Sequence, residues 1–131
     1  DPAPQGSKRH VGTGIMVESS KKLPGWRESV RAALIDGTGK PRAKFGDAPV
    51  ALSLLFVLRR PKSAPKRSTP RAKGRLDVDK LARAIGDAAT SAGVWRDDGQ
   101  VVSLQAKKRL ARVGETPGCH LRIVQLSENE E

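Results

Sequence analysis

The segment LDVDKLARAIGDAATSAG, residues 76–93, carries the clearest structural pattern in the sequence. Its apolar residues recur every three or four positions, so they share one face of a helix, and the pattern predicts that helix over residues 78–92. Gly93 stands where a glycine commonly ends a helix. The apolar positions are Val78, Leu81, Ala82, Ile85, Ala88, Ala89 and Ala92. A helix with one apolar stripe has to cover a sheet or another helix, and this requirement organises the rest of the chain.

The segments around this helix predict its partners. The expected strands lie at residues 14–17, 48–58, 101–108 and 119–126, and a first helix lies at 26–35. The strand at 48–58 is almost continuously apolar, and we expect it to be buried on both faces for much of its length. This order predicts one α+β domain over residues 1–131, with helices packed on a small sheet and an acidic end at 127–131 that frays.

The chain is strongly basic, with 25 Lys and Arg against 14 Asp and Glu and a formal net charge of +11. Such a charge is typical of proteins that bind nucleic acid or another polyanion. Aromatic residues are 3% of the chain, so the core is small and association of two copies would help to stabilise it. The single cysteine, Cys119, excludes a disulfide within the chain and fits a reducing cytoplasm or nucleoid. No apolar run reaches the length of a transmembrane helix.

Residues 59–75 form a second distinctive segment, RRPKSAPKRSTPRAKGR, which has no acidic residue and almost nothing apolar to bury. We expect a flexible loop that becomes ordered when a ligand binds. A solvated linker would have the same composition. The position of the segment favours a binding role, because it runs directly into the acidic residue Asp77.

Acidic residues are scarce in this chain, yet four of them stand in two pairs, Asp77 with Asp79 and Asp97 with Asp98. In an extended stretch that leads into a helix, the carboxylates of Asp77 and Asp79 can point to one side. The return from the helix to the next strand can bring Asp98 near Asp79, and carboxylate oxygens are the ligands that Mg²⁺ prefers. The same spacing fits a helix cap at Asp77 or Asp79 and a turn at 97–99. Spacing alone leaves a metal site and a purely structural role equally open.

These acidic pairs belong to a longer compound motif. It consists of LDVDKLAR at residues 76–83, Asp-Ala at 87–88 and GVWRDDGQVV at 93–102. The motif resembles that of the RusA family of Holliday-junction resolvases. The family pattern is Asp-x-Asp-Asn-Leu with a lysine three residues after the Asn, then Asp-Ala on the same helix, then Asp-Asp-x-Gln-Val. The opening segment 2–9 is similar to the basic stretch that follows the first strand in phage relatives, which implies that such a strand precedes Asp1.

The resemblance implies a RusA-like, homodimeric α+β fold with a small mixed, mostly antiparallel sheet and two main helices. It implies a Mg²⁺-dependent endonuclease, with Mn²⁺ as a substitute, that makes paired symmetrical nicks in a four-way DNA junction. Carried over by position, Asp77, Asp79 and Asp98 are the metal-binding carboxylates. Asp97, Asp87 and Lys80 are expected beside them, although Asp97 could be a turn residue and Asp87 a solvated or ion-paired acid.

Two positions depart from the family pattern. Lys80 stands where the family has Asn, and Arg83 stands where it has Lys. Arginine stays protonated near neutral pH, so Arg83 cannot serve as a proton donor. It can clamp phosphate charge, and we interpret it as a catalytic residue of that kind. The alternative is an ion-pair ladder of Asp79, Arg83 and Asp87 on the helix surface.

The resemblance also gives the basic segment a role, because junctions are recognised largely through shape and phosphate backbone. The expected DNA-binding residues are Arg59, Arg60, Lys62, Lys66, Arg67, Arg71, Lys73 and Arg75. The alternative function is a non-catalytic basic nucleic-acid-binding protein, although such a protein gains nothing from carboxylates in its basic face. A flap or fork as the preferred substrate is a further alternative.

Other residues offer no comparable site. His10 and His120 lie far apart, without the spacing of a metal site or a catalytic triad. Cys119 is expected to be a small buried residue rather than a nucleophile. Trp95 is expected to pack the turn that follows the main helix, and Trp26 to anchor the first helix.

Overall fold

The computed structural model describes residues 12–18, 26–74 and 77–129. The basic stretch at 2–9, His10 and Arg75 lie outside the described residues. The elements are β1 (Gly12–Glu18), α1 (Trp26–Leu34), β2 (Val50–Leu58), α2 (Val78–Ala92), the short 3₁₀ helix η2 (Asp98–Gln100), β3 (Val101–Leu110) and β4 (Gly118–Gln125). Each predicted helix and strand is therefore present, with bounds that differ by a few residues.

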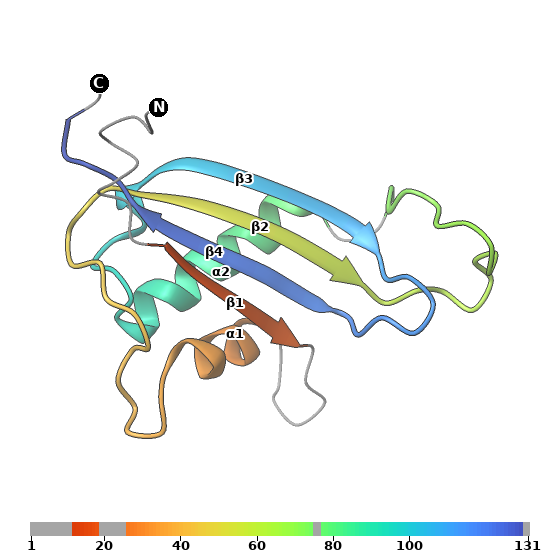
Figure 1. Ribbon diagram of the computed structural model, residues 1–131, viewed down its shortest axis with the longest axis horizontal. Helices are drawn as coiled ribbons and strands as arrows, with labels where there is room; N and C mark the ends of the chain where they lie inside the picture. The colour runs from red at the N-terminus through yellow and green to blue at the C-terminus, as the bar shows by residue number, and fades with distance from the viewer. Residues whose placement is uncertain (1–11, 19–25, 75–76, 130–131) are drawn as a thin grey trace, which may run out of the picture.

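The strands form a sheet of order β1-β4-β2-β3 (Figure 1). The strand β4 pairs antiparallel with both β1 and β2, whereas β2 and β3 are parallel. The parallel pair is joined through α2, in the way that a crossover helix normally joins parallel strands. An α+β fold with a mixed, mostly antiparallel sheet and two main helices is thus confirmed.

Both helices lie on the same face of the sheet (Figure 1). Alternate residues of β2 are buried against them: Val50, Leu52, Leu54 and Phe56. On the other face of the same strand, Ala51 and Leu55 are half-buried, Ser53 is exposed and Val57 is buried. The expectation that β2 is buried on both faces for much of its length therefore holds only towards the end of the strand, because both helices cover one face.

The helix α2 has the bounds and the buried stripe that the sequence predicts. Its buried residues are Leu81, Ala82, Ile85, Ala88, Ala89 and Ala92. Gly93 adopts φ 82° and its N–H donates to the carbonyls of Ala89 and Thr90, a left-handed ending that favours glycine. Trp95 is buried just beyond, and its indole Nε1 donates a hydrogen bond of 2.9 Å to Thr90 Oγ1. The predicted packing role of Trp95 is therefore confirmed.

The connection from β3 to β4, residues 111–117, has to pass the end of β2, because β2 lies between these two strands. The segment 59–74 leaves the sheet at that same end (Figure 1). The main-chain N–H of Ala111 donates to the carbonyl of Leu58 at 2.7 Å and joins the two segments. The topology thus brings the basic segment and the β3–β4 connection together.

Within the described part of the chain, no helix combines the length and the apolar character that crossing a membrane requires.

Candidate active site

Asp77 occupies the N-cap position of α2, with φ −68° and ψ 132°, but its side chain makes no capping hydrogen bond. The carboxylate is 63% exposed and lies 3.7 Å from Lys80 Nζ, an exposed ion pair that contributes little to stability. Asp79 follows in the first helical turn and is also exposed. Acidic residues at a helix N-terminus are favoured by the helix dipole. The capping alternative therefore accounts for the place of Asp77 in the chain but leaves its carboxylate oxygens available.

Gln100 fixes the second acidic pair. Its side-chain oxygen accepts hydrogen bonds from the main-chain N–H groups of Arg96 and Asp97, each at 2.9 Å. Its side-chain nitrogen donates to the carbonyls of Gly46 and Ala48, also at 2.9 Å. Because all four capacities of the amide are used this way, the side chain ties the turn before β3 to the loop before β2.

Asp97 is the N-cap of η2 and Asp98 is its first residue, so both lie in the turn that the sequence allows. A Cβ added to Gly99 would lie 2.8 Å from Oδ2 of Asp97, so the Asp97 carboxylate is folded back over the turn. Asp98 is exposed and begins η2. A Cβ added to Gly86 would lie 4.0 Å from the Cβ of Asp98, so Asp98 lies against the middle of α2.

The structure places the two acidic pairs, called the two acidic groups below, at different points along α2: Asp77 with Asp79 at its start and Asp97 with Asp98 beside its middle. Gly86 comes seven residues after Asp79, which is two helical turns and about 10 Å along the axis on the same side of the helix. The described residues contain no group of three or more acidic, histidine or cysteine side chains that could hold a metal ion. The three carboxylates are therefore not gathered at one point in the described chain, and Gln100 holds the turn that carries Asp98 beside Gly86.

Arg83 lies between the two acidic groups on the same side of α2, four residues after Asp79 and three before Gly86. Its side chain is exposed. In the part of the chain that the structure describes, Arg83 forms no ion pair with Asp79 or with Asp87, which is half-buried. The ion-pair ladder is therefore not formed, and the guanidinium is available to an anion.

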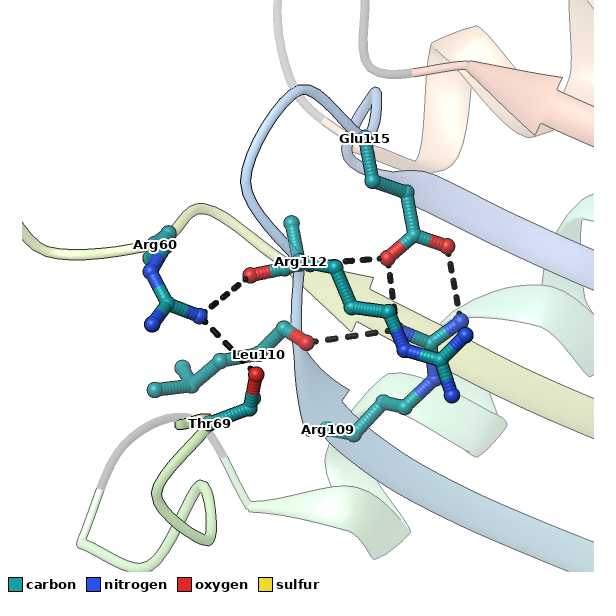
Figure 2. Close-up of polar contacts among 7 residues, drawn as sticks. Arg60, Thr69, Arg109, Leu110, Arg112 and Glu115 are labelled. Carbon is teal, nitrogen blue, oxygen red and sulfur yellow. Dashed lines mark hydrogen bonds and ion pairs between the residues drawn. The ribbon is translucent and has the colours of Figure 1, made fainter. Parts of the chain in front are cut away.

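The basic segment is organised by Arg60, one of its own residues (Figure 2). Its guanidinium donates to Thr69 Oγ1 and to the carbonyl of Ala111, each at 3.1 Å, and also to the carbonyls of Pro65 and Ser68. Ala72 is buried. The N–H donors of Arg60 are thus used in hydrogen bonds within the protein. Six other cations of the segment are exposed: Arg59, Lys62, Lys66, Arg67, Arg71 and Lys73.

Cys119 is fully buried in β4, and burial raises the pKa of its thiol to about 12. A thiol of that pKa does not form a thiolate near neutral pH, and the expectation that Cys119 is a small buried residue is confirmed. The neighbouring His120 is exposed on the sheet.

A strongly basic α+β domain that keeps exposed carboxylates where a basic loop meets a helix has the features of an enzyme that acts on nucleic acid. The family model for endodeoxyribonuclease RusA matches residues 1–124 of the 131-residue chain. The chain belongs to the RusA family, and it is an endodeoxyribonuclease of the Holliday-junction-resolving type that hydrolyses phosphodiester bonds. No curated protein sequence matches the chain.

Proposed function

We propose that this chain, acting as a homodimer, resolves four-way DNA junctions by paired symmetrical nicks, with Asp77, Asp79 and Asp98 as the metal-binding carboxylates. One observation carries the proposal. Asp79 from one half of the acidic motif and Asp98 from the other are exposed on one side of α2, with the exposed Arg83 between them. A protein that only bound DNA would lose affinity from carboxylates placed there.

The donor chemistry of these residues fits Mg²⁺. This ion is usually bound through one or two carboxylates, several waters and a substrate phosphate, rather than in a cage made entirely of protein. One such partial set of ligands comes from Asp77 with Asp79, and another comes from Asp98. The same carboxylate ligands suit Mn²⁺ as well. A divalent cation, when bound, activates water and neutralises charge on the phosphate.

The described side chains contribute binding and charge around that chemistry. Arg83 binds phosphate oxygens between the two acidic groups, where its planar guanidinium can donate two parallel hydrogen bonds. Lys80, 3.7 Å from Asp77, adds positive charge at the N-terminus of the helix. Neither side chain has to move a proton in this arrangement.

The edge strand β3 is the surface that we propose for the second copy of the chain. Val102 is 63% exposed and Leu104 is 54% exposed. By its pairing with Leu52, Leu104 belongs to the helix side of the sheet, yet it is uncovered because β3 is the outermost strand. An edge strand with exposed apolar side chains is favourable for pairing with another chain. A two-fold dimer fits a junction that offers two equivalent strands.

The test is a nicking assay on a labelled four-way junction, with and without Mg²⁺ or Mn²⁺. We expect the wild type to nick two opposed strands only with the metal. Asp77→Asn, Asp79→Asn and Asp98→Asn should each bind the junction and cut it at least about 100-fold more slowly. Glu28→Gln, the same change on an exposed residue of α1, is the control and should cut normally.

Two results of this assay would contradict the proposal. One is a wild-type protein that binds the junction and never nicks it, which is the behaviour of the non-catalytic alternative. The other is an Asp98→Asn variant that cuts as fast as the control. A flap and a fork included in the same assay rank the junction against the other branched substrates.

A further inference from the structure

The crossing of the β3–β4 connection over the end of β2 creates a cavity of ≈ 490 Å³ beside the basic segment. One wall comes from residues 59–66 and the other from residues 111–117. Two hydrogen bonds hold the two walls together. One runs from the Ala111 N–H to the carbonyl of Leu58, and the other runs from Arg60 to the Ala111 carbonyl (Figure 2). The cavity is therefore part of the fold at this end of the sheet, and it lies outside the acidic motif.

The lining of the cavity is rich in cations, and one of them, Arg112, acts electrostatically on Glu115 of the same lining. Arg59, Lys62, Lys66 and Arg112 contribute to it, and all four are exposed. Their side chains make no hydrogen bond or ion pair within the described residues. Arg60, the fifth cation of the lining, is held by its hydrogen bonds to the loop and stiffens the wall.

Glu115, the acidic residue of the lining, is already neutralised. Its two carboxylate oxygens accept hydrogen bonds from the guanidinium of Arg109 at 2.6 and 2.7 Å (Figure 2). One of them also accepts from the main-chain N–H of Arg112 at 2.9 Å. The pair fixes the turn that carries Arg112, and the remaining field of the cavity is positive.

We propose that this cavity binds phosphodiester groups of a DNA arm of the junction, separate from the acidic motif that cuts the strand. The inference rests on the proposed function and names a second DNA contact for it. None of the lining residues is aromatic, so a base or a free nucleotide has nothing to stack on. The cationic lining continues into the exposed basic segment, which suits a backbone that runs past the cavity.

Arg112 is the residue that distinguishes this site from the basic segment alone, because it lies on the opposite wall. Contacts of this kind do not read bases, so their loss should weaken binding to all sequences alike. They release counterions on binding, and removing one phosphate contact lowers the slope of log affinity against log salt by about one.

The experiment measures binding of a labelled four-way junction by fluorescence anisotropy over a series of salt concentrations, in EDTA, so that no cutting occurs. We expect Arg112→Ala to weaken binding several-fold and to reduce the salt slope by about one. Arg112→Glu should weaken binding further, and Arg112→Lys should stay close to the wild type. Arg27→Ala, which removes an equal charge from the exposed start of α1, should leave the slope unchanged.

Two outcomes would overturn the cavity site. One is an unchanged salt slope for Arg112→Ala, and the other is an equal loss of slope for Arg27→Ala, which would indicate net charge alone. A matching circular dichroism melting curve for Arg112→Lys and Arg112→Ala separates lost contact from lost folding. The binding is measured without metal, so it is independent of cutting. If the wild type cuts junctions but Arg112→Ala leaves the salt slope unchanged, only this site is refuted. If the wild type never cuts, only the proposed function is refuted.

Discussion

At the scale of single residues, Arg83 and Gln100 act on the acidic motif in different ways. Arg83 brings charge to the space between the two acidic groups, whereas Gln100 determines where the second group lies. Both side chains lie outside the hydrophobic core. Substituting Arg83 therefore tests the effect of charge, and substituting Gln100 tests the effect of the position of the second acidic group.

Arg83→Ala should lower the rate of junction nicking about 100-fold, because it removes a charged donor next to the scissile phosphate. Arg83→Lys should keep most of the rate, since lysine retains the positive charge at the same helix position. Single-turnover nicking rates measure both. If the lysine variant is as slow as the alanine variant, a phosphate clamp is not the role of Arg83.

Gln100→Glu should destabilise the protein by about 1–3 kcal/mol and slow nicking at saturating junction. The glutamate can still accept from the N–H groups of Arg96 and Asp97, but it places an acceptor against the carbonyls of Gly46 and Ala48. Urea unfolding and the nicking rate are the measurements. The control is Gln105→Glu on exposed β3, and equal behaviour of the two variants would show that Gln100 does not position the turn.

The sequence identifies the acidic pairs as candidate metal ligands, but it does not predict where they lie relative to one another. The motif contains Gln100, yet nothing local indicates that its amide reaches residues 46 and 48. Contacts at that sequence separation follow from the strand order. The position of Asp98 beside Gly86 was not predicted for the same reason. The sequence also did not predict that Arg60 donates hydrogen bonds within the protein, because the composition of a basic loop does not indicate a partner for any one arginine.

At the scale of elements, the helix α2 was the easiest to predict and the burial of β2 the hardest. The stripe of α2 and the position of Gly93 are local properties, and the structure has both. The burial of β2 depends on which face of the sheet receives α1 and α2, and the apolar run of the strand does not say that both helices take the same face.

The β3–β4 connection should make stability depend on pH through Glu115. The hydrogen bonds from Arg109 and Arg112 lower the pKa of this carboxyl from 4.5 to about 2 in the folded state. A lowered folded-state pKa contributes stability that is fully present above pH 4.5 and is lost as pH falls towards 2. Urea unfolding of the wild type and Glu115→Gln should therefore differ at neutral pH and converge in acid. A difference that persists unchanged down to pH 2 would contradict this assignment.

At the scale of the whole molecule, the cation-lined cavity, which also contains the exposed Val113, and the exposed apolar residues of β3 lie on different parts of the fold. The unpaired cations cluster at the end of the sheet where β2 and β3 finish, and the exposed Val102 and Leu104 lie along the edge strand. DNA and a second copy of the chain can thus bind without competing for the same residues.

Leu104→Lys should convert the proposed dimer to a monomer, because a charge replaces an apolar side chain at the edge that we propose for the partner. Ser103→Lys adds the same charge on the other face of β3, paired beside Ala51, and should leave the dimer intact. Light scattering with size-exclusion chromatography gives the mass of each. A wild-type protein that is monomeric at high concentration would exclude this interface.

The strand order also sets the sequence of events during synthesis on the ribosome. The strand β1 lies at the edge of the sheet, and its neighbour is β4, which is made after every other described strand. The nascent chain therefore holds β1 unpaired while β2, α2 and β3 emerge, and a loop of about a hundred residues closes only when β4 inserts. The basic segment, made between β2 and α2, emerges before that closure, when its positive charge is open to polyanions such as the surrounding RNA.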